Sequence, residues 1–223
     1  MYQLFKSLNK KAGLISTNII LVDDNKFNSI QTTPDSLFLN YILNKMVASK
    51  VEYCFMEVSS HALSQGRANG ILFDIAIFTN LSRDHLDYNL NFKNYFDAKK
   101  KLFHFPSLKV AVINIDDAYG KKLKSSLVKT KIKVLTYGIK SGDIRATHIE
   151  YSLVSTTFQL RIKKETYKIK APVVGEFNVY NLLAVISGLV GSGLPIQKVI
   201  KQVSYISQVP GRMERLGTKL TPQ

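Results

Sequence analysis

Acidic, hydroxyl and imidazole side chains gather directly after an apolar run near residue 57. The run at 51–56 ends with Met56, and Glu57 follows it, with Ser59 and His61 close behind. Such runs are typical of buried parallel strands, and the carboxyl ends of these strands are where α/β proteins collect ligand-binding groups. Carboxylate and hydroxyl oxygens are the ligands that Mg²⁺ prefers. The spacing therefore predicts a magnesium ligand at Glu57, although an acid that caps the next helix would have the same spacing.

A histidine and a lysine are further candidates for chemistry. His85 follows the apolar run at 75–78, and an ordinary imidazole pKa of about 6.5 leaves the side chain mostly neutral and able to bind a metal. Lys99 lies in the segment YFDAKKKLF, where burial and a neighbouring cation such as Lys100 favour loss of its proton. A solvated loop histidine and a solvated helix lysine are the alternatives that the residues alone leave open.

Two asparagines three residues apart form another candidate site. Asn178 and Asn181, in GEFNVYNLLA, can face one way from the first turn of a helix, where amides either cap the helix or contact a ligand. Arg212 follows later, in GRME. A phosphate loop of the form GxxxxGK[ST], which supplies a backbone cradle for phosphate, occurs nowhere in the sequence.

The elements around these residues alternate between strands and helices. Apolar runs at 53–58, 75–78 and 110–115 predict buried parallel strands, and the residues at 92–103 predict a helix. This alternation predicts an α/β fold with a mostly parallel sheet flanked by helices. From 145 to 170 the period becomes two, which predicts a small antiparallel portion.

The remaining segments give more local predictions. We expect a helix at 2–11, strands at 14–22 and 27–30, and helices at 178–190 and from 195 to about 206. Thr33 is predicted to cap a helix that has Pro34 at its first position. The apolar face expected for that helix is Leu37, Phe38, Tyr41, Ile42 and Met46. Cys54, the single cysteine, is predicted to be a buried small hydrophobic residue.

Size and composition bound the class of protein. The 223 residues are 45% hydrophobic, which is ordinary for a globular protein. No apolar run reaches the roughly 18 residues that span a bilayer, and the first residues lack the apolar region of a signal peptide, so a cytoplasmic protein without membrane contact is expected. The net charge of +15 suggests nucleic acid as a partner, because basic surfaces bind the phosphate backbone. However, the lysines are scattered along the chain and do not form one basic segment. No specific nucleic acid is therefore expected as a partner.

The quoted segments together resemble one family. The stretches MEVSSHALSQGR at 56–67, NLSRDHLDY at 80–88, the segment around Lys99, GEFNVYN and GRME are similar to the central, ATP-hydrolysing domain of the Mur ligases, most closely of the MurE type, the UDP-N-acetylmuramoyl-tripeptide synthetases. This resemblance implies a Mur ligase central domain at 1–208 and the beginning of a C-terminal domain at 209–223. Because the family's central domain opens with a phosphate loop, it also implies a chain that is truncated at the first strand of its sheet and has little or no ligase activity alone.

The resemblance implies a role for each candidate residue. Glu57, His85 and Lys99 would hold Mg²⁺ and act in catalysis, with Lys99 carbamylated by CO₂. Close relatives usually read D-Y-H where this chain has Asp87-Tyr88-Asn89, which leaves the role of position 89 open. The residues implied in binding the UDP-muramoyl peptide are Thr32, Thr33, Ser59, Gln65 and Arg67. Those implied in binding ATP are Asn178, Asn181 and Arg212.

The reaction that the resemblance implies is ATP-dependent amide formation. ATP phosphorylates the free carboxylate of UDP-MurNAc-L-Ala-D-Glu, and the amine of a diamino acid, meso-diaminopimelate or lysine, attacks the acyl phosphate. One alternative is another ATP-dependent ligase, of the folylpolyglutamate or cyanophycin synthetase kind, against which the segment from Ser59 to Arg67 argues. The other is a non-enzymatic basic module that binds through its charge.

Overall fold

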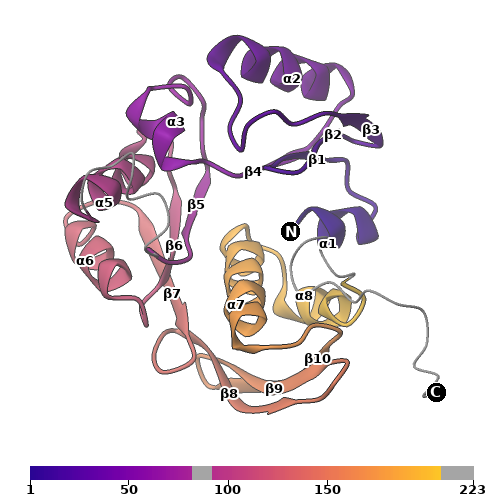
Figure 1. The fold of residues 1–223 in the computed structure, drawn as a ribbon. Helices are drawn as coiled ribbons and strands as arrows, with labels where there is room; N and C mark the ends of the chain where they lie inside the picture. The colour runs from indigo at the N-terminus through magenta and orange to yellow at the C-terminus, as the bar shows by residue number, and fades with distance from the viewer. Residues whose placement is uncertain (82–91, 207–223) are drawn as a thin grey trace, which may run out of the picture.

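The computed structural model describes residues 1–81 and 92–206. His85, Arg212 and the segment 209–223 lie outside the described residues, so the predictions for them stay predictions. The described chain forms an α/β fold with two sheets and helices around them (Figure 1). In this part of the chain no helix combines the length and the apolar character needed to cross a membrane.

The smaller sheet is mixed and has four strands in the order β3-β2-β1-β4. Its strands are β1 (Ala12–Ile15), β2 (Ile20–Val22), β3 (Asn25–Phe27) and β4 (Tyr53–Met56). β4 pairs with β1 in parallel, and the other pairs are antiparallel. The prediction of one strand at 14–22 is wrong because the chain turns back at Ser16, whose N–H and hydroxyl both donate to Ile19 O. Ser, Thr and Asn fill this turn, and such residues favour turns through local hydrogen bonds.

The larger sheet is mostly parallel and has six strands in the order β10-β9-β8-β7-β6-β5. Its strands are β5 (Ile75–Phe78), β6 (Val110–Asn114), β7 (Lys133–Gly138), β8 (Ile144–Tyr151), β9 (Thr156–Ile162) and β10 (Glu165–Ala171). β5 to β8 are parallel, and β8, β9 and β10 pair antiparallel. The predicted parallel sheet with a small antiparallel portion is confirmed.

Helices cover both faces of the six-stranded sheet (Figure 1). The helices are α1 (Tyr2–Ser7), α2 (Ser36–Ala48), α3 (Ser60–Ser64), α5 (Phe92–Lys101), α6 (Ala118–Ser126), α7 (Glu176–Gly191) and α8 (Ile196–Val203), with a 3₁₀ turn at Leu102–His104. α5 and α6 share a core with β5 and β6. α7 packs on the opposite face, where its apolar residues join α1, α8 and β6 to β10. α7 is apolar on nearly every side, and eight of its 16 residues are buried.

Helix α2 begins later than predicted. Asp35, and not Thr33, is its N-cap, and Asp35 Oδ1 accepts hydrogen bonds of 3.0 Å from the backbone N–H groups of residues 37 and 38. Aspartate caps a helix at least as well as threonine. The predicted apolar face is also partly wrong, because the buried residues are Leu39, Ile42 and Met46, whereas Leu37 is 87% exposed.

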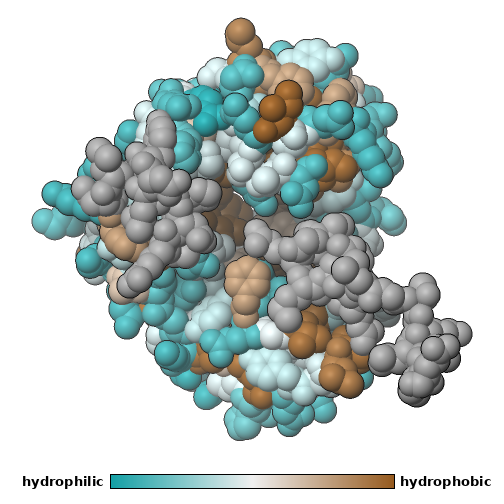
Figure 2. Space-filling model, in the orientation of Figure 1, coloured by the Kyte–Doolittle hydropathy of each residue, from teal (hydrophilic) through white to brown (hydrophobic). Residues whose placement is uncertain are grey.

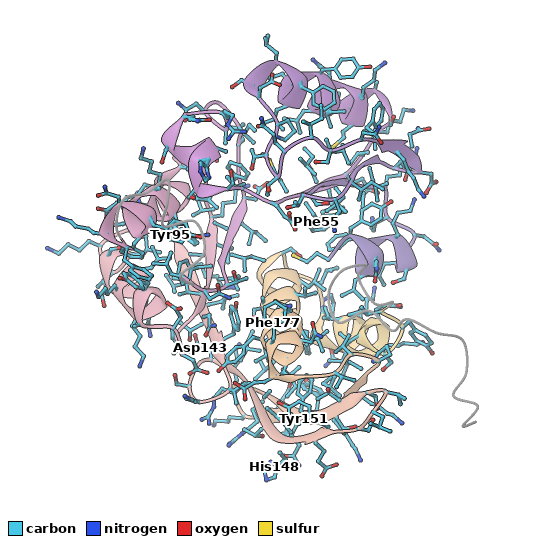
Figure 3. All side chains as sticks on the ribbon, in the orientation of Figure 1. Phe55, Tyr95, Asp143, His148, Tyr151 and Phe177 are labelled. Carbon is cyan, nitrogen blue, oxygen red and sulfur yellow. The ribbon has the colours of Figure 1, made fainter. Side chains whose placement is uncertain are left out.

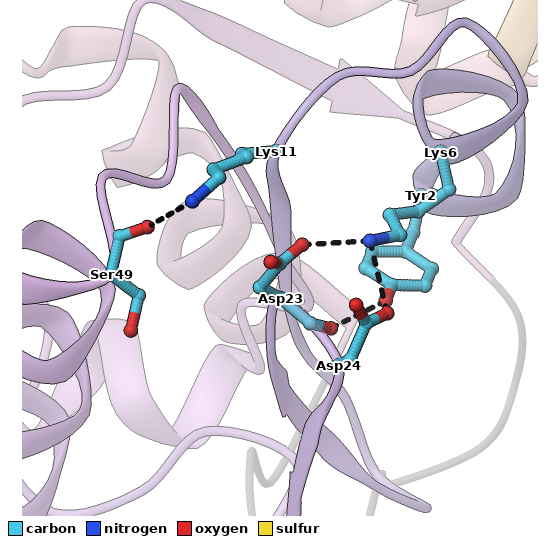
Figure 4. A network of polar contacts seen from close by, with 6 residues as sticks. All are labelled: Tyr2, Lys6, Lys11, Asp23, Asp24 and Ser49. Atoms are coloured by element: carbon cyan, nitrogen blue, oxygen red, sulfur yellow. Dashed lines mark hydrogen bonds and ion pairs between the residues drawn. The ribbon is translucent and has the colours of Figure 1, made fainter.

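A polar network fixes α1 against the turn between β2 and β3 (Figure 4). Lys6 Nζ lies 2.7 Å from Asp23 Oδ1 and 3.0 Å from Asp24 Oδ1, and Tyr2 donates to Asp23 O at 2.7 Å. The hydrogen bonds to these two carboxylates raise the pKa of Lys6. α1 ends at Ser7, earlier than the predicted residue 11, because Asn9 adopts a left-handed backbone with φ 55°.

β4 is an edge strand of the four-stranded sheet, and β5 is an edge strand of the six-stranded sheet. The space-filling view shows this face of the molecule hollowed at its centre, between the parts that carry the two sheets (Figure 2). β4 is less buried than its apolar sequence predicts, and Cys54 is exposed. The prediction of a buried cysteine is therefore wrong, since an edge strand leaves part of its surface uncovered.

Candidate functional site

Glu57 is presented at the carboxyl end of β4. Its Oε2 accepts hydrogen bonds from Thr17 N–H at 2.8 Å and from the Thr17 hydroxyl at 2.7 Å. Thr17 lies in the turn between β1 and β2, and its hydroxyl is also 3.1 Å from Thr32 Oγ1. Glu57 and Thr17 are exposed, Thr32 is half-buried, and both hydrogen bonds to the carboxylate end on one oxygen. Glu57 thus keeps a carboxylate oxygen in reach of a ligand.

Thr33 connects the loops that carry these residues. Its side chain is fully buried, and its hydroxyl donates to Glu57 O at 2.9 Å while accepting from Ser59 N–H at 2.9 Å. A buried hydroxyl that bridges two backbone groups fixes their relative position. Of the two predicted threonines, Thr33 therefore holds the loop in shape, and Thr32 is the one whose side chain reaches the surface.

The short helix α3 carries two more predicted residues. Ser59 is its N-cap, with Oγ accepting from Ala62 N–H at 3.1 Å. Gln65 ends the helix and is exposed. The strand β4, the acid Glu57 and the cap Ser59 follow one another along the chain, so the sequence order itself brings this part of the site together.

Arg67 reaches back to the loop before α2. Its guanidinium donates through one terminal nitrogen to the side chain of Gln31 and to Thr33 O. Arg67 Nε is buried and has no hydrogen-bond partner among the described residues. A buried N–H without a partner is costly, so the fold holds Arg67 in this place at some expense of stability.

Lys99 lies on α5, which packs against α3. Its Nζ is 5.0 Å from the centre of the Tyr95 ring, a residue labelled in Figure 3. Burial lowers the pKa of Lys99. A lower pKa increases the fraction of neutral amine, which is the form that reacts with CO₂. Of the three consecutive lysines, Lys101 is exposed, and Lys99 and Lys100 are both half-buried.

The residues present fit a magnesium ion in their chemistry. Glu57 supplies a carboxylate oxygen, and a carbamate on Lys99 would supply another hard donor. Between residues 1–81 and 92–206, no cluster of three His, Cys, Asp or Glu side chains forms a ready metal site. The third predicted ligand, His85, lies outside those ranges.

A second candidate site is a cavity of about 250 Å³ where β5, β6 and β7 end and α7 begins. It is lined by Thr79, Asn80, Asn114, Asp116, Asp117, Tyr137, Lys140, Phe177, Tyr180 and Asn181. Of the two predicted asparagines, Asn181 faces this cavity, whereas Asn178 donates to Val174 O at 2.9 Å. Neither caps α7, because the N-cap is Gly175 with φ 94°. Phe177, labelled in Figure 3, is 46% exposed at the first turn of α7.

Asp116 is the most heavily bonded acid of this cavity, and sequence reasoning missed it. Oδ2 accepts from Ile139 N–H at 2.6 Å, Lys140 N–H at 2.8 Å and the Tyr180 hydroxyl at 3.0 Å. Oδ1 accepts from the N–H and hydroxyl of Ser141 at 3.0 and 2.9 Å. Burial by itself raises the pKa of Asp116, but these donors outweigh it and hold the pKa below its ordinary value.

The neighbours of Asp116 connect the same strand ends. Asn114 donates through its amide to Thr79 O at 2.8 Å. Asp117 accepts from Leu81 N–H at 3.2 Å and also caps α6 through its other oxygen. The signal that the sequence offered was the polar group directly after the apolar strand β6, the same pattern that identified Glu57.

The comparisons with known proteins agree with this architecture. The sequence profile of the Mur ligase middle domain matches residues 1–188. The chain is 39% identical to the UDP-N-acetylmuramoyl-L-alanyl-D-glutamate--2,6-diaminopimelate ligase of Fusobacterium nucleatum, across 87% of this chain and 40% of the relative. It is 40% identical to the ligase of the same name from Bacillus velezensis, across 95% of this chain and 44% of that protein.

A solved structure of a ligase with this name superposes with a TM-score of 0.87 at 33% identity, covering 98% of this chain and 45% of that one. A MurF structure from Acinetobacter baumannii, 17% identical, shares the fold with a TM-score of 0.74. The chain thus spans about two fifths of the length of the curated relatives it matches. With the profile matching most of its residues, the chain belongs to the Mur ligase family.

Proposed function

We propose that this chain is the ATP-binding part of a MurE-type ligase, which joins 2,6-diaminopimelate to UDP-MurNAc-L-Ala-D-Glu with ATP and Mg²⁺. The observation that carries the proposal is the grouping of Glu57, Thr32, Ser59 and Arg67 around the carboxyl end of β4. The choice of diaminopimelate rests on the names of the relatives at 39% and 40% identity. Because the reaction needs ATP, the proposed compartment is the cytoplasm.

The muramoyl peptide is proposed to bind beside α3. Arg67 contributes a half-buried guanidinium next to the loop before α2, and its positive charge suits an anionic group of the peptide. Thr32 and Ser59 add hydroxyls, and Gln65 adds an exposed amide at the end of α3. Thr33 contributes by fixing the two loops rather than by direct contact through its hydroxyl.

Glu57, His85 and Lys99 are proposed as the magnesium ligands. When bound, Mg²⁺ neutralises charge on the transferring phosphoryl group and aligns the attacking and leaving oxygens. Thr17 holds Glu57 through two hydrogen bonds on Oε2, which orients the carboxylate. Burial lowers the pKa of Lys99 and so favours the neutral amine that carbamylation by CO₂ requires.

The nucleoside of ATP is proposed to occupy the cavity at the start of α7. The cavity offers an amide at Asn181, an aromatic face at Phe177 and a cation at Lys140, a combination that suits a flat polar base with a phosphate tail. Asn178 and Arg212 are the other proposed ATP-binding residues. Binding in these two places would bring the γ-phosphate to the free carboxylate of the peptide, which then becomes an acyl phosphate that the amine attacks.

The test is a titration of the ¹⁵N-labelled chain with UDP-MurNAc-L-Ala-D-Glu. We expect saturable shifts at Thr32, Ser59 and Arg67, and at least tenfold weaker binding in Arg67→Gln. Arg161→Gln, on the exposed side of β9, is the matched control and should bind like the wild type. Saturable shifts with a folate monoglutamate in place of the muramoyl peptide would overturn the MurE assignment in favour of a folylpolyglutamate-type ligase.

A further inference from the structure

Asp116 lines the candidate nucleoside cavity, yet its carboxylate is occupied by the protein itself. Five hydrogen bonds reach it, from residues 139, 140, 141 and 180, and both of its oxygens are used. A carboxylate in this condition has little capacity left for a ligand. Its function must therefore be sought in the groups that it holds.

We propose that Asp116 is a positioning residue, which holds the loop after β7 and the start of α7 in the arrangement that forms a purine-nucleoside pocket. This inference rests on the proposed function, because it assigns a new residue to the proposed ATP site.

The loop after β7 is shaped around this carboxylate. Three successive N–H groups, at 139, 140 and 141, point to Asp116, which fixes the backbone that carries Lys140 into the cavity wall. Gly138 allows the approach, because a Cβ there would lie 2.6 Å from Asp116 Oδ2 and 2.4 Å from Ser141 O. Such distances exclude any side chain without a shift of the loop.

Tyr180 brings the second wall into the same network. Its hydroxyl donates to Asp116 Oδ2 at 3.0 Å, and its ring lines the cavity one residue before Asn181. Burial, together with the hydrogen bond to Asp116, raises the pKa of Tyr180, so that the hydroxyl stays protonated and able to donate. One carboxylate thus connects the two elements between which a flat base would insert.

The same loop is held by a second acid, Asp143, which lies outside the pocket. Asp143 is exposed and accepts from the N–H and hydroxyl of Thr136, but it does not line the cavity. Asp116→Asn and Asp143→Asn therefore form a matched pair. Each neutralises one carboxylate that supports this loop, and only the first lies at the pocket.

The experiment has two readouts on the ¹⁵N-labelled 223-residue chain: amide hydrogen exchange without ligand, and titration with adenosine. In Asp116→Asn we expect exchange at residues 139–141 to accelerate at least tenfold and the adenosine Kd to rise at least tenfold. Tyr180→Phe, which removes one of the five donors and keeps the ring, should raise the Kd about threefold. Asp143→Asn should retain the wild-type Kd.

The outcomes separate this inference from the proposed function. If the wild type shows no saturable shifts with adenosine, the proposed ATP site is contradicted, and the exchange rates alone decide the role of Asp116. Unchanged exchange at residues 139–141 in Asp116→Asn would overturn the positioning role. So would an equal loss of adenosine binding in the two Asp→Asn variants, since that result assigns the effect to general loosening of the loop.

Discussion

Glu57 and Asp116 occupy corresponding places in the two sheets, and the molecule uses them in opposite ways. Each follows a parallel strand at its carboxyl end, β4 for Glu57 and β6 for Asp116. Glu57 is exposed, and its carboxylate accepts two hydrogen bonds, both from Thr17 and both on one oxygen. Asp116 accepts five, spread over both oxygens.

The difference shows that the hydrogen-bond donors around a carboxylate at a strand end determine its role. One that is oriented by donors on a single oxygen keeps the other for a cation. One that is saturated by N–H and O–H groups stabilises the backbone that presents those groups. The position of an acid at a strand end predicts that it has a role in the site. The number of donors that reach the acid determines whether it binds a ligand or holds the backbone of the site in shape.

The largest expected loss of stability comes from adding a side chain where α6 packs against the end of β6, next to Asp116. In Gly120→Ala the new Cβ would lie 1.8 Å from Asn114 O, so α6 must move away from β6. Such overpacking against backbone should lower the free energy of unfolding by about 3 kcal/mol. Urea unfolding measures it, with the exposed Ser125→Ala on the same helix as control. Adenosine binding should be lost while muramoyl-peptide binding persists, and loss of both together would mean that the two regions are not separable.

The next largest effect is the difference in unfolding free energy between variants that neutralise Asp116 and Glu57. Asp116→Asn should destabilise the fold by about 2 kcal/mol, since an amide cannot accept from all of the donors that face the carboxylate. Glu57→Gln should cost about 0.5 kcal/mol, because Glu57 is exposed and holds only the Thr17 turn. Urea unfolding of the pair measures both values. Equal costs would contradict the assignment of a structural role to one acid and a ligand role to the other.

The two adjacent threonines repeat the contrast on a smaller scale. Thr33→Val keeps the volume but leaves Ser59 N–H and Glu57 O without their buried partner, which should cost about 1.5 kcal/mol. Thr32→Val should leave the unfolding free energy within about 0.5 kcal/mol of wild type and should instead weaken the binding of the muramoyl peptide. The reverse order of stabilities would show that Thr32 holds the loop.

The smallest effect is a pH dependence that belongs to Asp116. Because its pKa is lowered in the folded protein, its contribution to stability is present above the ordinary carboxyl value of 3.8 and is lost as the pH falls through the lower folded pKa. The stability difference between wild type and Asp116→Asn should thus be constant near neutral pH and shrink in acid. Urea unfolding at a series of pH values tests this. A difference that does not change with pH would mean that the carboxylate does not titrate in this range.

The sequence predicts the strand–helix alternation well because long apolar runs such as β6 require burial in any fold. It misses β7, where Lys133 and Thr136 interrupt the apolar pattern, and it merges β1 with β2 because the short turn at Ser16 lies between two apolar stretches. The site residues on one continuous segment, such as Glu57 and Ser59, are predictable from order along the chain.

Contacts between distant segments are not predictable in this way. Thr17 meets Glu57 across 40 residues, and Asp116 meets Lys140 across 24. Nothing in the local pattern of either partner indicates the other, so the roles of Thr17 and Asp116 became evident only from the folded arrangement.

The most direct test of this account adds adenosine and UDP-MurNAc-L-Ala-D-Glu in turn to one ¹⁵N-labelled sample of the chain. We expect two separate sets of saturable shifts: Thr79, Lys140 and Asn181 with adenosine, and Thr32, Ser59 and Arg67 with the muramoyl peptide. Each ligand should bind in the presence of the other. Competition for one set of residues, or no saturable shift with either ligand, would contradict the division between a ligand-binding Glu57 region and a pocket shaped by Asp116.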